Sequence, residues 1–383
     1  MQNKLLFVIS HQPNPRFIKQ INYFSLNGFE VSVIYFHRDY LANLNNNIDK
    51  SVNLYLLDKI ENGQYIKRIF IYLKSIFKIK KLLKTINPNK IIITNMDILF
   101  LLILNNIKKY TNDIIMEISD LRSYTFNDKF SDKIQQYIDK VILDKYISKM
   151  IFTSPKFYEF YYQYKFKGDV FILENKPLSD MLPPLANKIK NDKFVIGIVG
   201  LLLDGKPHKA LFEYVKDKQD MEVHIYGKGL YEQQAIEYDK EYENIKYFGE
   251  FDFFKDISNI YASLNTIYMS YDTTNDDINI NLALPNKLYE AMYFKVPIIT
   301  TENTYLAQRV GENKLGYTVK CCDIGDIGKM INKIKENEEN ILLHLESIDE
   351  NEYTADGDYK RLANFIMSPR KIINFKNIYI PKW

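Results

Sequence analysis

The stretch Asn281–Thr301, NLALPNKLYEAMYFKVPIITT, carries the pattern that decides the fold. Its middle part predicts a short helix that opens at Pro285, because proline fits the first helical turn without losing a hydrogen bond. The run VPIIT that follows is typical of a buried strand. A helix that leads straight into an apolar strand indicates a parallel sheet covered on both faces.

The same alternation of strands and helices recurs on both sides of this stretch. Short β-branched runs in the first half predict strands, at Leu5–Ser10, Glu30–Phe36, Ile91–Thr94, Ile114–Ile118 and Met150–Thr153. A second series predicts five more, at Phe194–Val199, Glu222–Tyr226, Ile245–Phe248, Thr266–Met269 and Val296–Thr300. Amphipathic segments between them predict helices, among them Pro15–Asn27, Asp132–Ser148, Lys206–Asp217 and Ile324–Glu336. The sequence therefore predicts an α/β fold with two doubly wound, Rossmann-like domains.

The boundary between the two series of strands is residues 177–193, where three prolines stand among polar residues as in a linker. We predict an N-terminal Rossmann-like domain over 1–176 and a C-terminal Rossmann-like domain over 194–350. Residues 351–383 are expected to form a helix and tail that return to the N-terminal domain. Since ligands of open α/β sheets bind beyond the carboxyl ends of the strands, the expected site is a central cleft between the domains.

Composition excludes several classes of function. The chain has 51 Lys and Arg against 48 Asp and Glu, a net charge of +3, which is too small to indicate nucleic acid as a partner. Its two cysteines, Cys321 and Cys322, are adjacent, so they offer no disulfide framework and no zinc spacing. The longest apolar run, Ile98–Leu104, is too short to span a bilayer. These features fit a cytoplasmic protein without a metal site.

Lys287 and Glu290 lie one turn apart on the helix that Pro285 opens, and therefore share a face. The N–H groups of a first helical turn attract anions, and Lys287 adds a full positive charge. Glu290 is placed to accept hydrogen bonds from a pair of hydroxyls. This arrangement suits the diphosphate and the ribose of a nucleoside diphosphate. The alternative is an ordinary solvated salt bridge between the two side chains.

The motif PNKLYEAM followed by VPIITT resembles the nucleotide-binding motif of glycosyltransferases with the two-Rossmann GT-B fold, of the retaining family 4 or group 1 type. The likeness is greatest to bacterial enzymes that build capsules and other surface polysaccharides, and it extends to residues 14–36, 197–211 and 225–229. It implies a nucleotide-sugar donor, a UDP-sugar, bound by the domain over 194–350, and an acceptor bound by the domain over 1–176, with no further cofactor and no metal. The residues that it assigns to the donor are Gly200, Lys206, Gly227, Pro285, Asn286, Lys287, Leu288 and Glu290, with Glu290 on the ribose.

Two positions depart from the family pattern. Many retaining members have a second glutamate at the position of Leu282, and an arginine at the position of Leu201. Retention and inversion of configuration therefore both stay open. Two other functions also stay open: a nucleotide-sugar epimerase of similar fold, and an inactive partner subunit that only binds nucleotide.

Polar residues that follow the first-half strands are candidates for chemistry on the acceptor. Glu117 and Asp120 come at the end of a predicted strand, where an inverting enzyme needs a general base, and the turn position favours Asp120. An equally weighted alternative is that they cap a helix or bind Arg122. His11 is a third catalytic candidate, and Arg16 is expected on the acceptor side.

The segment Tyr65–Ile86 is basic, aromatic and helical in period, with no acidic residue. Its lysines gather on one face, at Lys67, Lys74, Lys78 and Lys81. Helices of this kind lie on anionic membranes, although a covering helix with lysines in water shows the same pattern. We therefore predict a glycosyltransferase that extends a bacterial surface glycan. Its expected acceptor is a free or lipid-linked glycan, and its expected location is peripheral, on the inner face of the cytoplasmic membrane.

Overall fold

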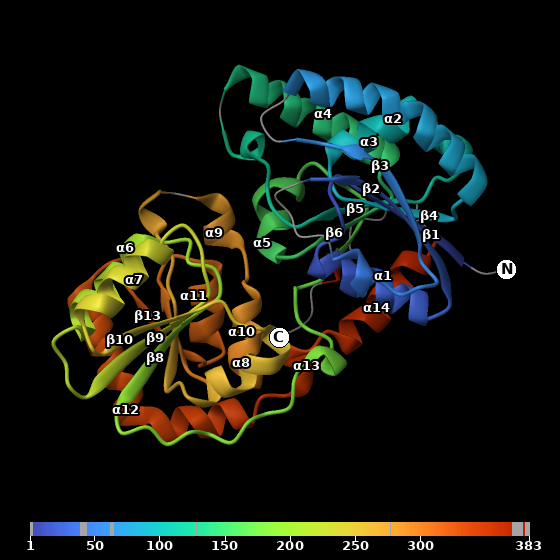
Figure 1. The fold of residues 1–383 in the computed structure, drawn as a ribbon. Helices are drawn as coiled ribbons and strands as arrows, with labels where there is room; N and C mark the ends of the chain where they lie inside the picture. The colour runs from blue at the N-terminus through green and yellow to red at the C-terminus, as the bar shows by residue number, and fades with distance from the viewer. Residues whose placement is uncertain are drawn as a thin grey trace. The chain divides into compact units, whose positions relative to one another are not determined.

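The computed structural model describes residues 3–38, 44–61, 65–127, 129–275, 277–369 and 378–379. The chain divides into two compact units (Figure 1). Unit 1 comprises Met1–Glu174 and Gly357–Trp383, and unit 2 comprises Asn175–Asp356. Each unit is a parallel sheet with helices on its faces.

Unit 1 is built on an eight-stranded sheet with the order β14-β7-β6-β5-β4-β1-β2-β3. Its strands are β1 Asn3–Ile9, β2 Phe29–His37, β3 Asn53–Lys59, β4 Lys90–Ile93, β5 Ile114–Ile118, β6 Lys149–Phe152, β7 Asp169–Ile172 and β14 Ile378–Tyr379. Every residue of β4 and β5 is buried, as expected for central strands covered on both faces. The strand order reverses between β1 and β4, so ligands are expected at the carboxyl edge of these strands.

The helices of unit 1 form a layer on each face of this sheet. They are α1 Pro15–Leu26, α2 Tyr65–Ile86, α3 Met96–Leu104, α4 Phe130–Tyr146, α5 Pro155–Phe157 and α14 Asp356–Met367. Short helical turns lie at η1 Asn45–Asn47, η2 Ile107–Lys109, η3 Ser123–Thr125 and η4 Tyr158–Tyr162. Right-handed crossovers from β3 through β6 place α2, α3 and α4 together on the face opposite α1 (Figure 1). The helix α14 packs with α1, where the rings of Tyr23 and Tyr359 are 4.8 Å apart.

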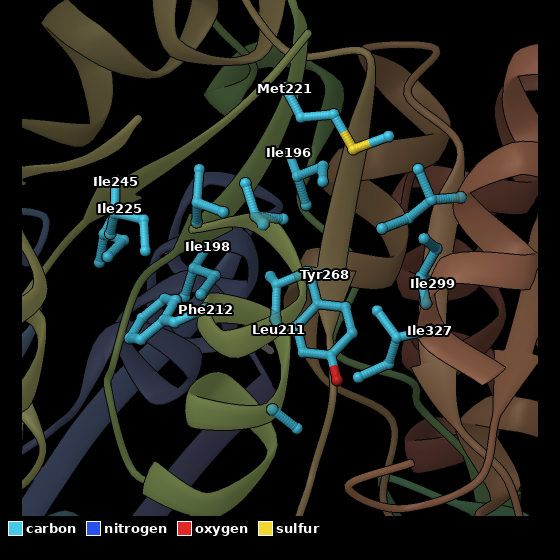
Figure 2. Close-up of a cluster of buried hydrophobic side chains, with 14 of the residues drawn as sticks. Ile196, Ile198, Leu211, Phe212, Met221, Ile225, Ile245, Tyr268, Ile299 and Ile327 are labelled. Atoms are coloured by element: carbon cyan, nitrogen blue, oxygen red, sulfur yellow. The ribbon is translucent and has the colours of Figure 1, made fainter. Parts of the chain in front are cut away.

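Unit 2 has a six-stranded sheet with the order β10-β9-β8-β11-β12-β13. Its strands are β8 Phe194–Val199, β9 Met221–Tyr226, β10 Ile245–Gly249, β11 Thr266–Met269, β12 Ile298–Thr301 and β13 Gly316–Val319. Its helices are α6 Gly205–Val215, α7 Glu232–Glu241, α8 Phe253–Ala262, α9 Ile278–Leu282, α10 Asn286–Tyr293, α11 Tyr305–Glu312, α12 Ile324–Glu346 and α13 Glu350–Tyr353, with turns η5 Ser179–Met181 and η6 Thr273–Asn275. One core cluster joins Ile196 and Ile198 of β8 to Phe212 of α6, Tyr268 of β11 and Ile327 of α12 (Figure 2).

The predicted α/β architecture with two doubly wound sheets is confirmed. The strands β3, β7, β13 and β14 were not among those predicted. Residues 177–193, which the sequence predicts as a linker, instead run along unit 2. There the Pro183 carbonyl accepts a hydrogen bond from Tyr293 Oη at 2.8 Å, and the Ile189 N–H donates to the Ala262 carbonyl at 3.0 Å.

Candidate donor-binding site

A cavity of about 340 Å³ lies at the carboxyl edge of the unit 2 sheet, where the strand order reverses between β8 and β11. The ends of these two strands and the first turn of α10 form most of its lining. This is the position at which open α/β sheets bind their ligands.

The helix α10 has one face in the core and one face on the cavity. Pro285 is its N-cap residue, and Leu288 and Met292 are buried against the sheet. Lys287 and Glu290, on the other face, line the cavity together with Pro285. Leu288, which the family resemblance assigns to the donor, has its side chain fully buried in the core beneath α10.

Two glycine turns make room for the lysine. Gly200, directly after β8, has φ +101°, and a methyl group there would lie 2.8 Å from Lys287 Cε. Gly227, directly after β9, has φ +122°, and a methyl group there would lie 1.9 Å from the Gly200 carbonyl oxygen. Both positions therefore favour glycine for conformation, and Gly227 also requires it for space because the atoms it would meet belong to the backbone. The consequence is that the Lys287 side chain lies across the end of β8.

A tyrosine from another helix holds the carboxylate of Glu290. Tyr261 Oη, on α8, donates a hydrogen bond to Glu290 Oε2 at 3.1 Å. The Tyr261 ring is fully buried and stacks on Phe294 with 4.6 Å between ring centroids. Burial raises the pKa of Glu290, although the Tyr261 hydrogen bond and the charge of Lys287 act in the opposite direction. The carboxylate is thus fixed in place before any ligand arrives.

Lys287 supplies the positive charge of this cavity. Burial lowers the pKa of Lys287, while the nearby carboxylates of Glu290 and Asp204 raise it. Asp204 also lines the cavity, and burial raises its pKa. His208, another lining residue, has its pKa lowered to about 3 by burial and by the charge of Lys287. At neutral pH His208 is therefore uncharged, and an anionic ligand would meet Lys287 as its cation.

The other predicted donor residues have their own partners. Lys206 Nζ forms an ion pair with Asp272 Oδ2 at 3.1 Å, and its side chain is 64% exposed. The carboxylate of Asp272 raises the pKa of Lys206. Asn286, at the start of α10, accepts a hydrogen bond on Oδ1 from Asn175 Nδ2 at 2.5 Å. Lys206 is not among the lining residues of the cavity, so a diphosphate bound there would compete with Asp272 for it.

Two of the predicted residues in unit 1 belong to a buried network. Glu117 is 1% exposed and accepts hydrogen bonds from Arg16 Nε at 2.6 Å and from Gln20 Nε2 at 2.8 Å. Arg16 also donates to the Leu173 carbonyl at 3.3 Å. The predictions of Glu117 as a base and of Arg16 as an acceptor contact are therefore corrected. The alternation of β5 turns Glu117 toward α1, where both side chains support the packing.

A second cavity, of about 280 Å³, lies at the carboxyl edge of the unit 1 sheet. Asp120 is exposed and lines this cavity, close to Arg122 and Tyr124. His11 is not among the lining residues. Its Nδ1 lies 2.6 Å from the Gln12 carbonyl, and burial lowers its pKa, with further lowering by Arg38 and Arg122.

The lysines of α2 lie along the edge next to β3. Lys67 Nζ pairs with Glu61 at 3.1 Å, and Lys74 Nζ lies 3.9 Å from Asp58. Lys78 Nζ donates to the Leu56 carbonyl at 2.6 Å, whereas Lys81 is exposed. Within the described part of the chain, no helix is long and apolar enough to cross a membrane. The described residues also contain no group of three or more His, Cys, Asp or Glu placed to hold a metal ion.

Comparison with known proteins places this geometry in a family. Residues 185–353 match the family described as glycosyl transferases group 1. The chain therefore contains a group 1 glycosyltransferase domain. The match contains the cavity and all of α10, so this glycosyltransferase has its family domain in unit 2. No curated protein sequence matches the chain.

Several solved structures share the fold of this glycosyltransferase. The lipopolysaccharide outer core galactosyltransferase WaaB is 13% identical with a TM-score of 0.64, over 95% of this chain and 99% of that one. HepE from Anabaena in complex with UDP is 12% identical with a TM-score of 0.65, over 95% and 99%. Sucrose-phosphate synthase from Thermosynechococcus elongatus is 12% identical with a TM-score of 0.67, over 95% and 98%. At these identities the likeness shows the fold, and the predicted GT-B fold is confirmed.

Sequence reasoning missed Asp204 and His208, which line the donor cavity, and Tyr261, which is not a lining residue but holds Glu290. Tyr261 lies in NIYAS, where an aromatic residue on an amphipathic helix is read as core. His208 follows the family lysine by two residues, but a lone histidine gives no signal of its own. Asp204 carried the best signal, since an aspartate directly before a helix is a common N-cap. Here it lies at the N-cap position of α6 without a capping hydrogen bond from its side chain.

Proposed function

We propose that this glycosyltransferase moves a sugar from a UDP-sugar to a growing bacterial surface glycan. The observation that carries the proposal is the pair Lys287 and Glu290 on the cavity face of α10, within the group 1 domain. A galactosyltransferase of the lipopolysaccharide outer core and a HepE structure titled as a UDP-glucose complex, both with the same fold, support this choice of donor and product.

The donor would bind with its ribose on Glu290 and its diphosphate at the first turn of α10. A carboxylate accepts two hydrogen bonds from a diol, and charge-assisted bonds of this kind are among the strongest in proteins. Lys287 and the N–H groups of the helix start would neutralise the diphosphate. The pre-set Tyr261 to Glu290 hydrogen bond means that little reorganisation is needed on binding.

The transfer breaks the bond between the anomeric carbon and the diphosphate, and forms a bond from that carbon to an acceptor hydroxyl. Negative charge grows on the leaving diphosphate, where Lys287 and the start of α10 stabilise it without a metal ion. The acceptor hydroxyl loses its proton. For an inverting reaction we propose that Asp120 is the base that takes this proton. For a retaining reaction we propose that the leaving phosphate takes it.

We further propose that the acceptor is a capsular or lipopolysaccharide glycan on a lipid carrier, at the cytoplasmic face of the membrane. A charged nucleotide donor is made in the cytoplasm, and a lipid-linked glycan is confined to the bilayer. An enzyme that joins them must work at that boundary, as a peripheral membrane protein.

The proposal is tested by measuring UDP release from a panel of UDP-sugars, with bacterial lipid extracts as acceptors and EDTA present throughout. We expect UDP release that requires one particular UDP-sugar together with the lipid fraction. Glu290→Gln should reduce this release. Conversion of the donor to an isomeric nucleotide sugar without acceptor would make the protein an epimerase. Tight UDP binding without release for any donor would make it an inactive binding subunit.

A further inference from the structure

The outer face of α4 carries an apolar stripe. Phe130, Ile134, Tyr137 and Val141 follow one another at steps of four, three and four, which places them on one side of the helix. Phe130 is 81% exposed and Tyr137 is 70% exposed. A helix that covers a sheet ordinarily turns polar residues outward, so this arrangement is the reverse of the expected one.

The neighbouring helix α2 shows the same feature. Its buried side consists of Ser75, Ile79 and Leu83, which pack toward the sheet. Its exposed large apolar residues lie on other sides of the helix, at Ile69, Phe70, Leu73 and Phe77. Between α2 and α4 in the helix layer, α3 adds exposed Phe100 and Leu104. We call these residues of α2, α3 and α4 the apolar face.

The apolar face is next to the second cavity. Arg68 of α2, Asp97 of α3 and Gln135 of α4 all line that cavity, so the N-terminal halves of the three helices meet around it. Phe70 is two residues from Arg68, and Phe130 is in the first turn of α4. Exposed aromatic side chains and a polar pocket therefore lie at the same N-terminal end of the helix layer, although Phe70 and Arg68, two residues apart, point to different sides of α2. A polar pocket at the same end as an exposed apolar face suits a ligand that is part sugar and part lipid.

Charge indicates what covers this face. The 22 residues of α2 include six lysines and one arginine but no acidic residue. On α4, Lys133 and Lys140 are exposed, Asp132 and Asp144 are half-buried, and Asp139 points inward and accepts hydrogen bonds from Tyr124 and Tyr161. A second copy of the same basic face would be repelled. Anionic lipid headgroups complement the lysines, and acyl chains complement the aromatic and aliphatic residues.

We infer that the apolar face docks on an anionic lipid bilayer, with Phe70, Phe130 and Tyr137 inserted at the interface and the second cavity held at headgroup level. The docking surface is therefore the aromatic side of α2 and α4, and the lysines of α2 assist from its edge. This inference rests on the proposed function only for the identity of the acceptor, a glycan carried by a lipid. The binding to bilayers stands independently of catalysis.

The test is flotation of the full chain with vesicles of phosphatidylcholine, with and without phosphatidylglycerol. The test variant combines Phe70→Ser, Phe130→Ser and Tyr137→Ser, all at exposed positions. The matched control combines Tyr164→Ser and Phe254→Ser, which remove aromatic residues that are 83% and 64% exposed outside the helix layer. Calorimetry with UDP and size-exclusion chromatography with light scattering accompany each sample.

We expect the wild type and the control to float with the anionic vesicles, and the test variant to lose about tenfold or more in partitioning. UDP affinity should be the same in all three, which separates this inference from the donor site. Flotation of the test variant like the wild type would overturn it, as would a wild type that binds UDP but not anionic vesicles. Equal flotation on pure phosphatidylcholine would overturn the role of charge. A dimer that the test variant dissociates would make the face a protein interface instead.

Discussion

Replacement of Glu290 should separate donor affinity from stability. The carboxylate is held by Tyr261 Oη at 3.1 Å, in a site where burial raises its pKa. A pKa raised by folding means that the ionised group costs folding free energy at neutral pH, so stability is lost as pH rises through that pKa. Glu290→Gln keeps an oxygen acceptor for Tyr261 and removes the buried charge. This variant should be as stable as the wild type or more stable.

The same change should weaken donor binding. Hydrogen bonds to a charged group contribute about 1.5–3 kcal/mol, which corresponds to roughly a 10- to 150-fold change in affinity. Glu290→Ala should lose that much affinity for UDP and also destabilise the fold by about 1–3 kcal/mol, because the buried Tyr261 hydroxyl is left without this partner. Tyr261→Phe should weaken UDP binding by less, at about 1 kcal/mol, because Glu290 remains but is no longer held.

Isothermal titration calorimetry with UDP and urea unfolding of the four proteins check these values. The effects of Tyr261→Phe and Glu290→Ala should not add in the double variant, since the tyrosine acts through the carboxylate. The reasoning is refuted if Glu290→Ala binds UDP as tightly as the wild type while folded. It is also refuted if Glu290→Gln loses stability without losing affinity, because Glu290 would then be a structural residue.

Three further changes test other parts of the site. Lys287→Met should weaken UDP binding by about 1.5–3 kcal/mol but leave uridine binding nearly unchanged in a competition titration, and equal losses for both ligands would remove the lysine from the diphosphate. The affinity for UDP should fall at acidic pH as Glu290 gains a proton, and at alkaline pH as Lys287, whose pKa is lowered, loses one. In Glu290→Gln the loss of affinity at acidic pH should shrink to the part caused by protonation of the phosphate itself, while the loss at alkaline pH should remain. The assignment is contradicted if the loss of affinity at acidic pH is the same in this variant as in the wild type. Arg16→Met should lower the free energy of unfolding in urea by about 3–5 kcal/mol with UDP affinity preserved, because it leaves Glu117 buried without its ion pair; an unaffected stability would show that the pair is not structural.

The fold was predictable where strands are continuous apolar runs. The strands β4 and β5 consist almost entirely of buried β-branched or aliphatic residues, and both were predicted within one residue at each end. The edge strand β3, NLYLLDK, mixes polar and apolar residues because one side of it is exposed, so no run marks it. The strand β13, GYTV, is too short to stand out from a turn.

Sequence could predict only the part of the donor site that lies on a single helix, α10. The spacing of Lys287 and Glu290 predicts that both lie on one face of α10, and both line the cavity, because helical periodicity fixes which residues share a face. Sequence cannot tell which face of a doubly buried strand meets which helix, so the burial of Glu117 against α1 could not be foreseen. Tyr261 comes from a different helix, and only the tertiary fold brings it to Glu290.

The most direct test of the donor site is a crystal structure of the full chain with UDP bound in the presence of EDTA. The account predicts the ribose hydroxyls within hydrogen-bond distance of the Glu290 carboxylate, and the diphosphate between Lys287 Nζ and the first turn of α10. It would be contradicted by UDP bound in the second cavity of unit 1, or by UDP in unit 2 with its ribose away from Glu290.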